Sequence, residues 1–539
     1  MLTYDFSDLN GRTLTEYLYA RIREDILSGR LKEGMKMPSK RSFAGNIGVS
    51  TITVENAYAQ LTAEGYLRAE PRRGFFVAPV GSLLEPSGGG APAPRTGSFP
   101  ALSGVRVSAP SPGRAPEPSG GGRGRSREAE QKSGIPEAEQ KSGIPEAEQK
   151  SGISEAELQA QELIDLTGAA ADRETFPFAA WARISRKVLT ERRDALLTRA
   201  PGAGILELRE AIAQYLLQYQ GLDVSPGQII VGAGTEYLYS LLIRLLGPDR
   251  TYAVETPGYP KTARIYESNR VNVCHIPMDR AGIRTDKLEK SGADVVHISP
   301  SHQFPTGITM PVGRRAELLE WAGKTAAGRY IIEDDYDSEF RLSGRPIPPL
   351  MSIDHGGRVI YLNTFTKSLA STIRISYMVL PAGLLEQYRE RLGFYSCTVS
   401  NFEQYTLAAF IREGFFEKHI NRMRTYYRQK QDRLLQEIAQ GPLEELVRVK
   451  GTGAGLHFLM EVRTDRSERE LSALALDRGV KIAGLQEYAM APEADGEKML
   501  PAGNDSASGT GDPQMVVSYI GLSDRQIRKL PSLLAEAWM

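Results

Sequence analysis

The sequence predicts a multidomain protein in which a small helix-turn-helix module precedes an α/β domain with a mostly parallel sheet. Three observations support this fold class. Apolar residues recur at helical spacing in the first 80 residues and end in a glycine-tipped hairpin. The chain between residues 81 and 160 is rich in glycine and proline. From residue 165 to residue 539, helical patterns alternate with short β-rich runs, which is typical of a parallel sheet.

The composition excludes several classes of protein. The 539 residues include 66 Lys and Arg and 66 Asp and Glu, so the chain is neither polybasic nor polyacidic. Two cysteines are too few for a disulfide framework, and the six scattered histidines lack metal-ligand spacing, so no metal site is predicted. The first 30 residues do not resemble a signal peptide, and no apolar run reaches the ~18 residues of a membrane span. We therefore expect a soluble, cytoplasmic protein.

The N-terminal segment is predicted to form three helices. Apolar residues at helical spacing place the first over Thr15–Ser28. Ser39 is a natural N-cap for the second helix, and Gly48 ends it. Ser50 is expected to cap the third helix, so that the second and third helices form a helix-turn-helix.

A β-hairpin after the third helix is predicted to form a wing. Its strands are expected over Tyr66–Glu70 and Phe75–Ala78, with the tip at Pro71–Gly74. In such a module the third helix enters the major groove of DNA, and basic side chains contact phosphates. DNA binding is thus assigned to residues 10–80, and the alternative is a small helical domain with a basic turn. The candidate DNA-binding residues are Lys40, Arg41, Ser50, Thr51, Thr53, Glu55, Arg72, Arg73 and Gly74.

Residues 81–160 are predicted to be a disordered linker. They contain 14 of the 53 glycines and 10 of the 32 prolines but a single aromatic residue, Phe99. Such a segment buries too little apolar surface to offset the entropy lost on ordering. The motif EAEQKSGIP recurs with a nine-residue period from Glu128. We interpret it as a spacer, because the unit is too short for a solenoid repeat.

Two motifs in the α/β region each follow an apolar strand. Lys367 comes directly after the strand Val359–Asn363 and is flanked by threonines, a setting that suits a Schiff-base lysine beside a phosphate. Four carboxylates follow the strand Tyr330–Glu333, where one of them could pair with a cationic pyridine nitrogen. Taken singly, these motifs also fit an ordinary surface lysine and a solvated acidic turn.

Two further motifs follow the strands Gln228–Val231 and Thr251–Glu255. The first strand leads into a glycine-rich turn at a helix N-terminus, which is a ready phosphate-binding site. The second leads to Tyr259, an aromatic residue at a strand end. A further strand is expected over Val295–Ser299.

The N-terminal module resembles the GntR-type winged helix over nearly its whole length. The resemblance rests on the Pro38–Arg41 turn, the Ser50–Val54 helix start and the wing glycine Gly74. Two positions depart from the usual pattern. Thr51 stands where the family usually has Arg, and Glu55 stands where a basic residue is common. Glu55 could accept a hydrogen bond from a cytosine amino group, so base recognition would differ.

Residues 165–539 resemble fold-type I, aminotransferase-like proteins that use pyridoxal 5'-phosphate (PLP). More narrowly, the chain resembles the MocR/GabR subgroup of GntR-type regulators, in which a winged helix is fused through a long linker to such a domain. The subgroup motifs present here are Phe176-Pro177 with Trp181, Leu208–Ile212, Ser299–Gly307, Glu333–Tyr336 and Gly453–His457.

This resemblance implies roles for individual residues. Lys367 would form the Schiff base with PLP, Asp334 would pair with the pyridine nitrogen, and Tyr336 would hydrogen-bond the phenolic oxygen. Tyr259 would stack on the ring. The resemblance also implies a head-to-tail homodimer whose sites are built from both subunits. The residues implied to hold the phosphate are Gly234, Thr235, Thr364 and Arg374.

Three departures argue against amino-acid binding in the usual pose. Phe304 replaces the Asn that aminotransferases usually carry before Pro-Thr-Gly. Arg199 falls where a Tyr of the second subunit often reaches the phosphate. The last strand, Met515–Gly521, contains no Arg to bind a substrate carboxylate. Lys261 falls where some relatives place an Arg near the ligand.

The expected function is a PLP-dependent, DNA-binding transcription regulator that senses an amine, an amino acid or PLP itself. The alternative is an active PLP-dependent aminotransferase with an accessory DNA-binding domain. A third hypothesis is a DNA-binding dimer with a vestigial cofactor site. Because the carboxylate-binding Arg is missing, poor or absent transamination is expected.

Overall fold

The structure, a computed structural model, describes residues 13–70, 73–78, 163–168, 175–325, 328–342, 348–453, 455–490 and 512–539, together with Tyr4. The predicted linker, residues 81–160, lies outside the described residues, as do Pro71 and Arg72 of the predicted wing tip. Among the described residues, no helix is long and apolar enough to cross a membrane.

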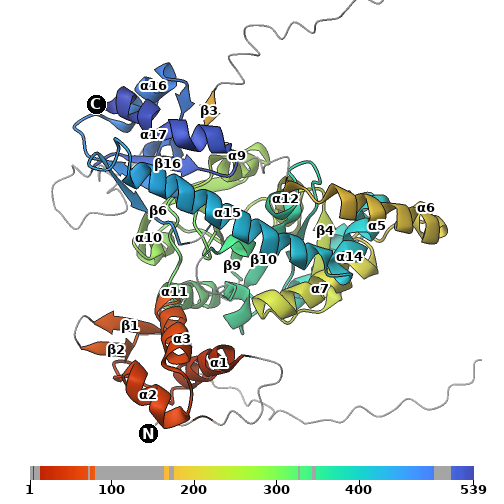
Figure 1. The fold of residues 1–539 in the computed structure, drawn as a ribbon. Helices are drawn as coiled ribbons and strands as arrows, with labels where there is room; N and C mark the ends of the chain where they lie inside the picture. Colours follow the sequence, from red (N-terminus) through yellow and green to blue (C-terminus); the bar gives the residue numbers. More distant parts are fainter. Residues whose placement is uncertain are drawn as a thin grey trace, which may run out of the picture. The chain divides into compact units, whose positions relative to one another are not determined.

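The N-terminal module has the predicted three helices and hairpin (Figure 1). The side chains of Ser39 and Ser50 accept hydrogen bonds from backbone N–H groups at the starts of the second and third helices. Gly48 ends the second helix in a left-handed conformation (φ 69°), which glycine adopts without steric cost. Leu18 and Tyr58 are fully buried in its core. The elements are α1 (Leu14–Leu27), α2 (Lys40–Ile47), α3 (Thr51–Ala63), β1 (Leu67–Glu70) and β2 (Gly74–Val77).

The second part contains an eight-stranded sheet with the order β4-β11-β10-β9-β8-β5-β6-β7. Neighbours from β10 through β6 run parallel, whereas β11 is antiparallel to both of its neighbours and β7 is antiparallel to β6. The mostly parallel sheet is therefore confirmed, and each strand predicted for this sheet agrees with an observed one to within one residue at either end. The strands are β4 (Ile229–Gly232), β5 (Thr251–Thr256), β6 (Asn272–Asp279), β7 (Gly282–Ile283), β8 (Val295–Ile298), β9 (Tyr330–Asp334), β10 (Val359–Thr364) and β11 (Ser376–Val379).

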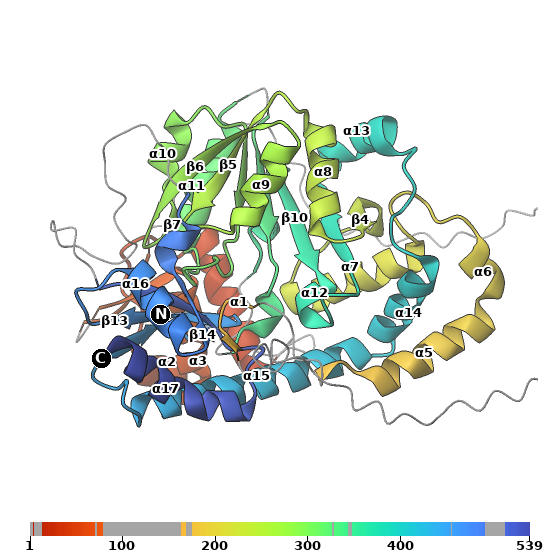
Figure 2. The ribbon, with the colours of Figure 1, turned by 90° about the horizontal axis from the view of Figure 1, so that it is seen from above.

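Helices connect these strands and pack beside the sheet, as Figure 2 shows for α8, α9 and α10. Such crossover helices are the usual connection between parallel strands. The helices up to β11 are α5 (Phe178–Glu191), α6 (Arg193–Leu197), α7 (Leu206–Gln220), α8 (Thr235–Leu246), α9 (Pro260–Ser268), α10 (Thr285–Lys290), α11 (Val312–Gly323) and α12 (Phe365–Ser368). The later helices are α13 (Ala382–Leu392), α14 (Asn401–Arg412), α15 (Phe415–Ala439), α16 (Glu468–Asp477) and α17 (Asp524–Trp538).

A smaller, antiparallel sheet lies at the C-terminal end, in the order β12-β13-β16-β15. The long helix α15 packs against α14 at one end and against α17 of this smaller layer at the other (Figure 1). A two-residue strand, β3 (Ile164–Asp165), pairs with β14 (Val480–Lys481) and ties the start of the domain to its end. The other strands are β12 (Val447–Lys450), β13 (His457–Val462), β15 (Ala483–Gly484) and β16 (Gln514–Ser518).

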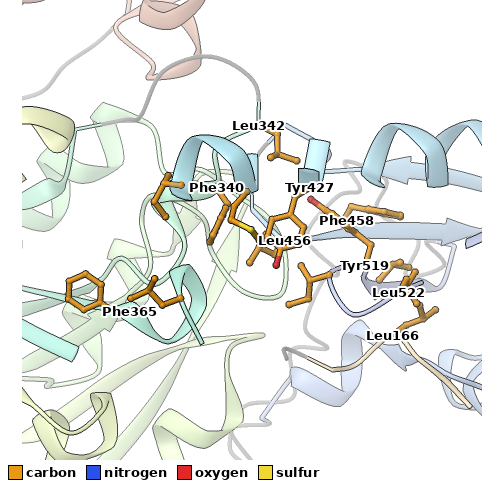
Figure 3. Close-up of a cluster of buried hydrophobic side chains, with 14 of the residues drawn as sticks. Leu166, Phe340, Leu342, Phe365, Tyr427, Leu456, Phe458, Tyr519 and Leu522 are labelled. Carbon is orange, nitrogen blue, oxygen red and sulfur yellow. The ribbon is translucent and has the colours of Figure 1, made fainter. Parts of the chain in front are cut away.

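A continuous apolar core joins the two sheets, and Figure 3 shows part of it. Phe340 meets the ring of Tyr427 edge-on, with 5.4 Å between the ring centroids. Phe458 on β13 stacks against Tyr519, which follows β16. The carboxyl ends of the parallel neighbours β8, β9 and β10 meet at one edge of the large sheet. Open parallel sheets bind ligands at such an edge.

Candidate functional site

Lys367 lies in α12, immediately after the carboxyl end of β10. Burial lowers the pKa of its ammonium group, and the charge of Asp337 opposes that effect. The register of the sheet pairs Leu362 on β10 with Asp334 on β9. The polar groups that follow or end these two strands therefore lie at the same edge of the sheet. A lysine with a lowered pKa has more of the neutral amine that attacks a carbonyl group.

Asp334 ends β9 and is held by two neighbours through one of its oxygens. Tyr239 donates a hydrogen bond to Oδ2 at 2.7 Å, and Nε2 of His297 lies 3.5 Å from the same atom. His297 is in turn fixed through Nδ1 by the hydroxyl of Tyr266 at 2.7 Å. The other oxygen, Oδ1, is buried and has no hydrogen-bond partner among the described residues. An acceptor left unpaired is costly, so this atom fits a cationic N–H group such as a protonated pyridine ring.

A second buried histidine lies beside Tyr336. Nδ1 of His302 is 2.9 Å from Oδ2 of Asp337 and 3.3 Å from the hydroxyl of Tyr336. His457 packs against His302, and its Nε2 lies 3.2 Å from the carbonyl oxygen of Pro305. Ligand atoms of the two histidines and Asp337 lie within 4.8 Å of one another. Since hydrogen bonds already occupy Nδ1 of His302 and Nε2 of His457, we describe them as a network, and the expected absence of a metal site stays a prediction.

The glycine-rich turn before α8 has the shape of an anion-binding site. Gly234 adopts φ 91°, and a Cβ atom there would lie 2.5 Å from Nη2 of Arg374. Thr235 begins α8, whose first-turn N–H groups and dipole favour an anion. The hydroxyl of Thr364 accepts a hydrogen bond from Ser376 and donates one to Thr366, each at 2.8 Å. The structure thus brings Gly234, Thr235 and Arg374 together around a cradle that fits a phosphate.

Glu236 in the first turn of α8 organises the cations beside this cradle. Its carboxylate contacts Lys261 closely and lies 3.5 Å from Arg374. The hydrogen bond from Lys261 is the largest influence that lowers the pKa of Glu236. Arg374 itself has a positive φ of 53°, a strained conformation for a side-chain-bearing residue that is often found at ligand sites.

The remaining predicted cofactor and substrate residues are more loosely arranged. Tyr259 is 56% exposed and meets Phe304 edge-on, with 5.9 Å between ring centroids. Arg199 donates a hydrogen bond to Ser396 at 2.9 Å. Val516 and Val517, from which a carboxylate-binding side chain would project, are buried on β16.

Some of the predicted DNA-binding residues already make contacts within the winged-helix module, and others are exposed. Ser50 and Thr53 are used in capping α3, with a backbone hydrogen bond of 3.0 Å. Glu55 on α3 pairs with Lys40 on α2 at 2.6 Å, so it is not an isolated carboxylate. Arg41 and Thr51 are exposed, which leaves them accessible to DNA.

The wing residues show a second arrangement. Arg73 pairs with Glu70 and lies over the ring of Phe76, 5.4 Å from its centroid. Gly74 has φ 110°, which the hairpin turn requires. Arg72 lies outside the described residues, so its predicted role stays a prediction.

Sequence reasoning missed several side chains that build the site. Tyr239 and His297 hold Asp334, and the pair His302 and Asp337 lies behind Tyr336. His297 stands in the middle of the predicted strand Val295–Ser299, two residues before the Ser299–Gly307 motif, and this position was an available signal. The others become neighbours only through the strand order.

Comparisons with known proteins agree with both parts of the structure. The profile of the family described as bacterial regulatory proteins, gntR family, matches residues 14–77, and that of aminotransferase class I and II matches residues 164–488. The HTH-type transcriptional regulator YdeL of Bacillus subtilis is 36% identical over 89% of this chain and 91% of its own length. The probable rhizopine catabolism regulatory protein MocR of Rhizobium meliloti is 29% identical over 90% of each chain.

Among solved structures, an archaeal alanine:glyoxylate aminotransferase matches with a TM-score of 0.60 and 25% identity. The match covers 71% of this chain and 93% of that one. A class I and II aminotransferase fold implies the use of PLP, and the unpaired Oδ1 of Asp334 and the cradle at Gly234 fit that cofactor. The chain therefore belongs to the GntR-type regulators of the MocR group, in which a winged helix is fused to an aminotransferase-like domain.

Proposed function

We propose that this protein is a transcription regulator that binds operator DNA through residues 10–80 and senses PLP, or an amine or amino acid that reacts with it, through residues 165–539. Residues 81–160 serve as the linker between them. A regulator of this kind acts in the cytoplasm, where its operator lies. The observation that supports the proposal is the polar edge at the carboxyl ends of β9 and β10, which carries both the unpaired Oδ1 of Asp334 and, just after β10, Lys367.

Each side chain of this edge has a distinct task in the proposal. Lys367 binds the cofactor covalently, Asp334 accepts from its ring nitrogen, and Tyr336 donates to its phenolic oxygen. PLP supplies an electrophilic carbon and an electron-withdrawing ring. Arg374 and the N-terminus of α8 bind the phosphate and orient the ring.

The remaining cofactor residues complete the proposed site. Gly234, Thr235 and Thr364 contribute to the phosphate cradle, and Tyr259 packs on the ring. Tyr259 is exposed and touches the ring of Phe304 edge-on, which leaves one face of its own ring accessible to a bound cofactor.

We also propose a head-to-tail homodimer. Large apolar side chains on α5, α6 and α7 remain solvent-exposed in a single chain, which is typical of a surface covered by a partner. A twofold dimer would cover the same surface on both copies. A ligand changes transcription in this scheme only if it favours one arrangement of the dimer over another. The exposed residues are Phe178, Leu197, Leu206 and Leu217, with 69%, 84%, 50% and 52% of their surface accessible.

Efficient transamination is not expected. It requires the substrate carboxylate to be held in a bidentate grip, and β16 presents buried Val516 and Val517 instead of an Arg. Lys261, which falls where some relatives place an Arg near the ligand, is already paired with Glu236. We therefore assign the aminotransferase-like domain to sensing.

Two measurements test the proposal. Borohydride reduction of the PLP-loaded protein followed by peptide mapping should place the pyridoxyl group on Lys367, and a label on another lysine would contradict the assignment. Incubation with a panel of amino acids and 2-oxoglutarate or pyruvate should produce spectral change without sustained turnover. Steady turnover near the ~10 per second that is typical of enzymes would favour the alternative, an active aminotransferase.

A further inference from the structure

The hydrogen-bonded pair of Asp337 and His302 is buried directly behind Tyr336. Asp337 and His302 are only 2% and 3% exposed, and 2.9 Å separates Oδ2 from Nδ1. The same Nδ1 lies 3.3 Å from the hydroxyl oxygen of Tyr336. One imidazole nitrogen therefore faces both a carboxylate and a phenol.

This geometry fixes which nitrogen of His302 carries the proton. An ionised carboxylate can only accept, so Nδ1 must donate to Asp337 and carries the hydrogen. Nδ1 then has no lone pair for the hydroxyl of Tyr336. The phenol oxygen can accept from Nδ1, but its own proton must be directed elsewhere. The proton of Tyr336 is then left for the carboxylate of Asp337, which also hydrogen-bonds the phenol, or for an acceptor on the cofactor side once a cofactor is bound.

The surrounding chain makes room for His302 in this one orientation. A Cβ atom on Gly455 would lie 1.8 Å from the imidazole ring, so only glycine fits there. Gly455 also has φ 73°, and its carbonyl oxygen accepts a hydrogen bond from Tyr519 at 2.9 Å. Nε2 of His302 is buried without a hydrogen-bond partner among the described residues. His457 packs against the ring at 4.7 Å between centroids.

We propose that His302, oriented by Asp337, is a positioning residue that keeps Tyr336 as a hydrogen-bond donor toward the phenolic oxygen of the cofactor. This inference rests on the proposed function, because it assumes that PLP binds at Lys367. It assigns to the Asp337–His302 pair the same task at the oxygen end of the ring that His297 and Tyr239 perform at Asp334. The consequence is a lower affinity of the bound cofactor for its proton, since a donated hydrogen bond stabilises the deprotonated oxygen.

Burial and the nearby carboxylates all raise the pKa of the Tyr336 phenol. Burial is the largest cause that raises the pKa of Tyr336 well above its usual range. The charges of Asp337 and Asp334, a hydrogen bond to Asp337 and the charge of Glu255 add to it. Tyr336 therefore remains protonated. Burial lowers the pKa of the neighbouring His457 well below its usual range, and the charges of His302 and Lys367 lower it further.

The test is a pH titration of the visible absorbance of the PLP-loaded protein. The variants are His302→Gln, Tyr336→Phe and the double variant, with exposed His355→Gln as the matched control. His302→Gln and Tyr336→Phe should each raise the apparent pKa of the absorbance change by about one pH unit, as expected for a weakened hydrogen bond to a charged acceptor. His355→Gln should leave it unchanged. Asp337→Asn, a second variant in case His302→Gln does not fold, should shift it in the same direction.

The double variant separates positioning through Tyr336 from general loosening of the site. In the Tyr336→Phe background, His302→Gln should add less than about 0.3 pH units, because its effect passes through the missing hydroxyl. Shifts that simply add, or an unchanged titration in His302→Gln and Asp337→Asn while Tyr336→Phe moves, would overturn the inference and leave the proposed function intact. A wild-type protein that shows no visible band with PLP would instead refute the proposed function, and the inference would fall with it.

Discussion

Replacing Asp334 by Asn removes one negative charge from the site with little change in shape. In the structure Oδ2 already has Tyr239 and His297 as neighbours, whereas Oδ1 is buried and unpaired. A hydrogen bond to a charged partner contributes about 1.5–3 kcal/mol, and one between neutral groups about 0.5–1.5 kcal/mol. The substitution should therefore weaken PLP binding by about 1–2 kcal/mol, which corresponds to roughly a 5- to 30-fold higher Kd.

The assay is a titration of the apoprotein with PLP, followed by absorbance at neutral pH and low protein concentration. Asp477→Asn is the matched control. It removes the same charge at the exposed end of α16, a helix that is not part of the cofactor edge of the large sheet. Circular dichroism establishes that both variants are folded. An unchanged Kd in Asp334→Asn, or an equal loss in both variants, would refute the assignment of Asp334 as the partner of the pyridine nitrogen.

Three further predictions concern DNA recognition and stability. Arg41→Ala should lower operator affinity and reduce the slope of log K against log salt by about 0.9, as measured by fluorescence anisotropy, and an unaltered slope would argue against a phosphate contact. Glu55→Gln should relax specificity at one operator base pair by about 1–3 kcal/mol. Loss of the exposed ion pair with Lys40 should lower the unfolding free energy by at most about 1 kcal/mol. Footprinting on single-base operator variants would show the relaxed specificity, and a uniform loss of affinity on all of them would contradict it. Burial raises the pKa of Glu339 from 4.5 to about 8. Between these two pH values the folded protein keeps a proton that the unfolded chain has lost. The free energy of unfolding therefore falls as the pH rises from about 4.5 to about 8. Glu339→Gln should flatten that fall in urea unfolding between pH 5 and about 8, whereas an equally steep fall would show that other groups cause it.

The strands of the large sheet could be predicted because each is a short apolar run that ends at a recognisable motif. β9 and β10, for example, differ from the predicted strands by a single residue at one end. The smaller sheet was not distinguished. Of its strands only β16 overlaps a predicted one, Met515–Gly521, and β15 is two residues long, too short to show any periodicity. Periodicity within a short stretch of sequence reports only local structure, whereas such short strands form because they pair with a neighbouring strand.

The site divides in the same way. Lys367, Asp334 and Tyr336 lie in motifs that follow strands, so the sequence alone indicates them. His297 and Tyr239 become neighbours of Asp334 only because β8 lies beside β9 and α8 packs nearby. Long-range pairings of this kind depend on strand order, which periodicity does not encode.

The DNA-binding module also contains a contact that the sequence did not predict. The sequence identified Glu55 as an unusual carboxylate on the third helix but not its ion pair with Lys40, which comes from the neighbouring helix. The pairing changes the interpretation, because Lys40 must release or share Glu55 when DNA binds. Its energetic weight is small in water and larger in a desolvated DNA interface.

The measurement that tests the central claim most directly is the affinity for DNA from the region upstream of the gene, with and without PLP, in the wild type and in Lys367→Ala. If the aminotransferase-like domain is the sensor, PLP should change the affinity or the footprint of the wild type. Lys367→Ala should bind the same DNA and show no response to PLP at concentrations that saturate the wild type. Identical binding in all four conditions, or an equal response to PLP in Lys367→Ala, would contradict the account.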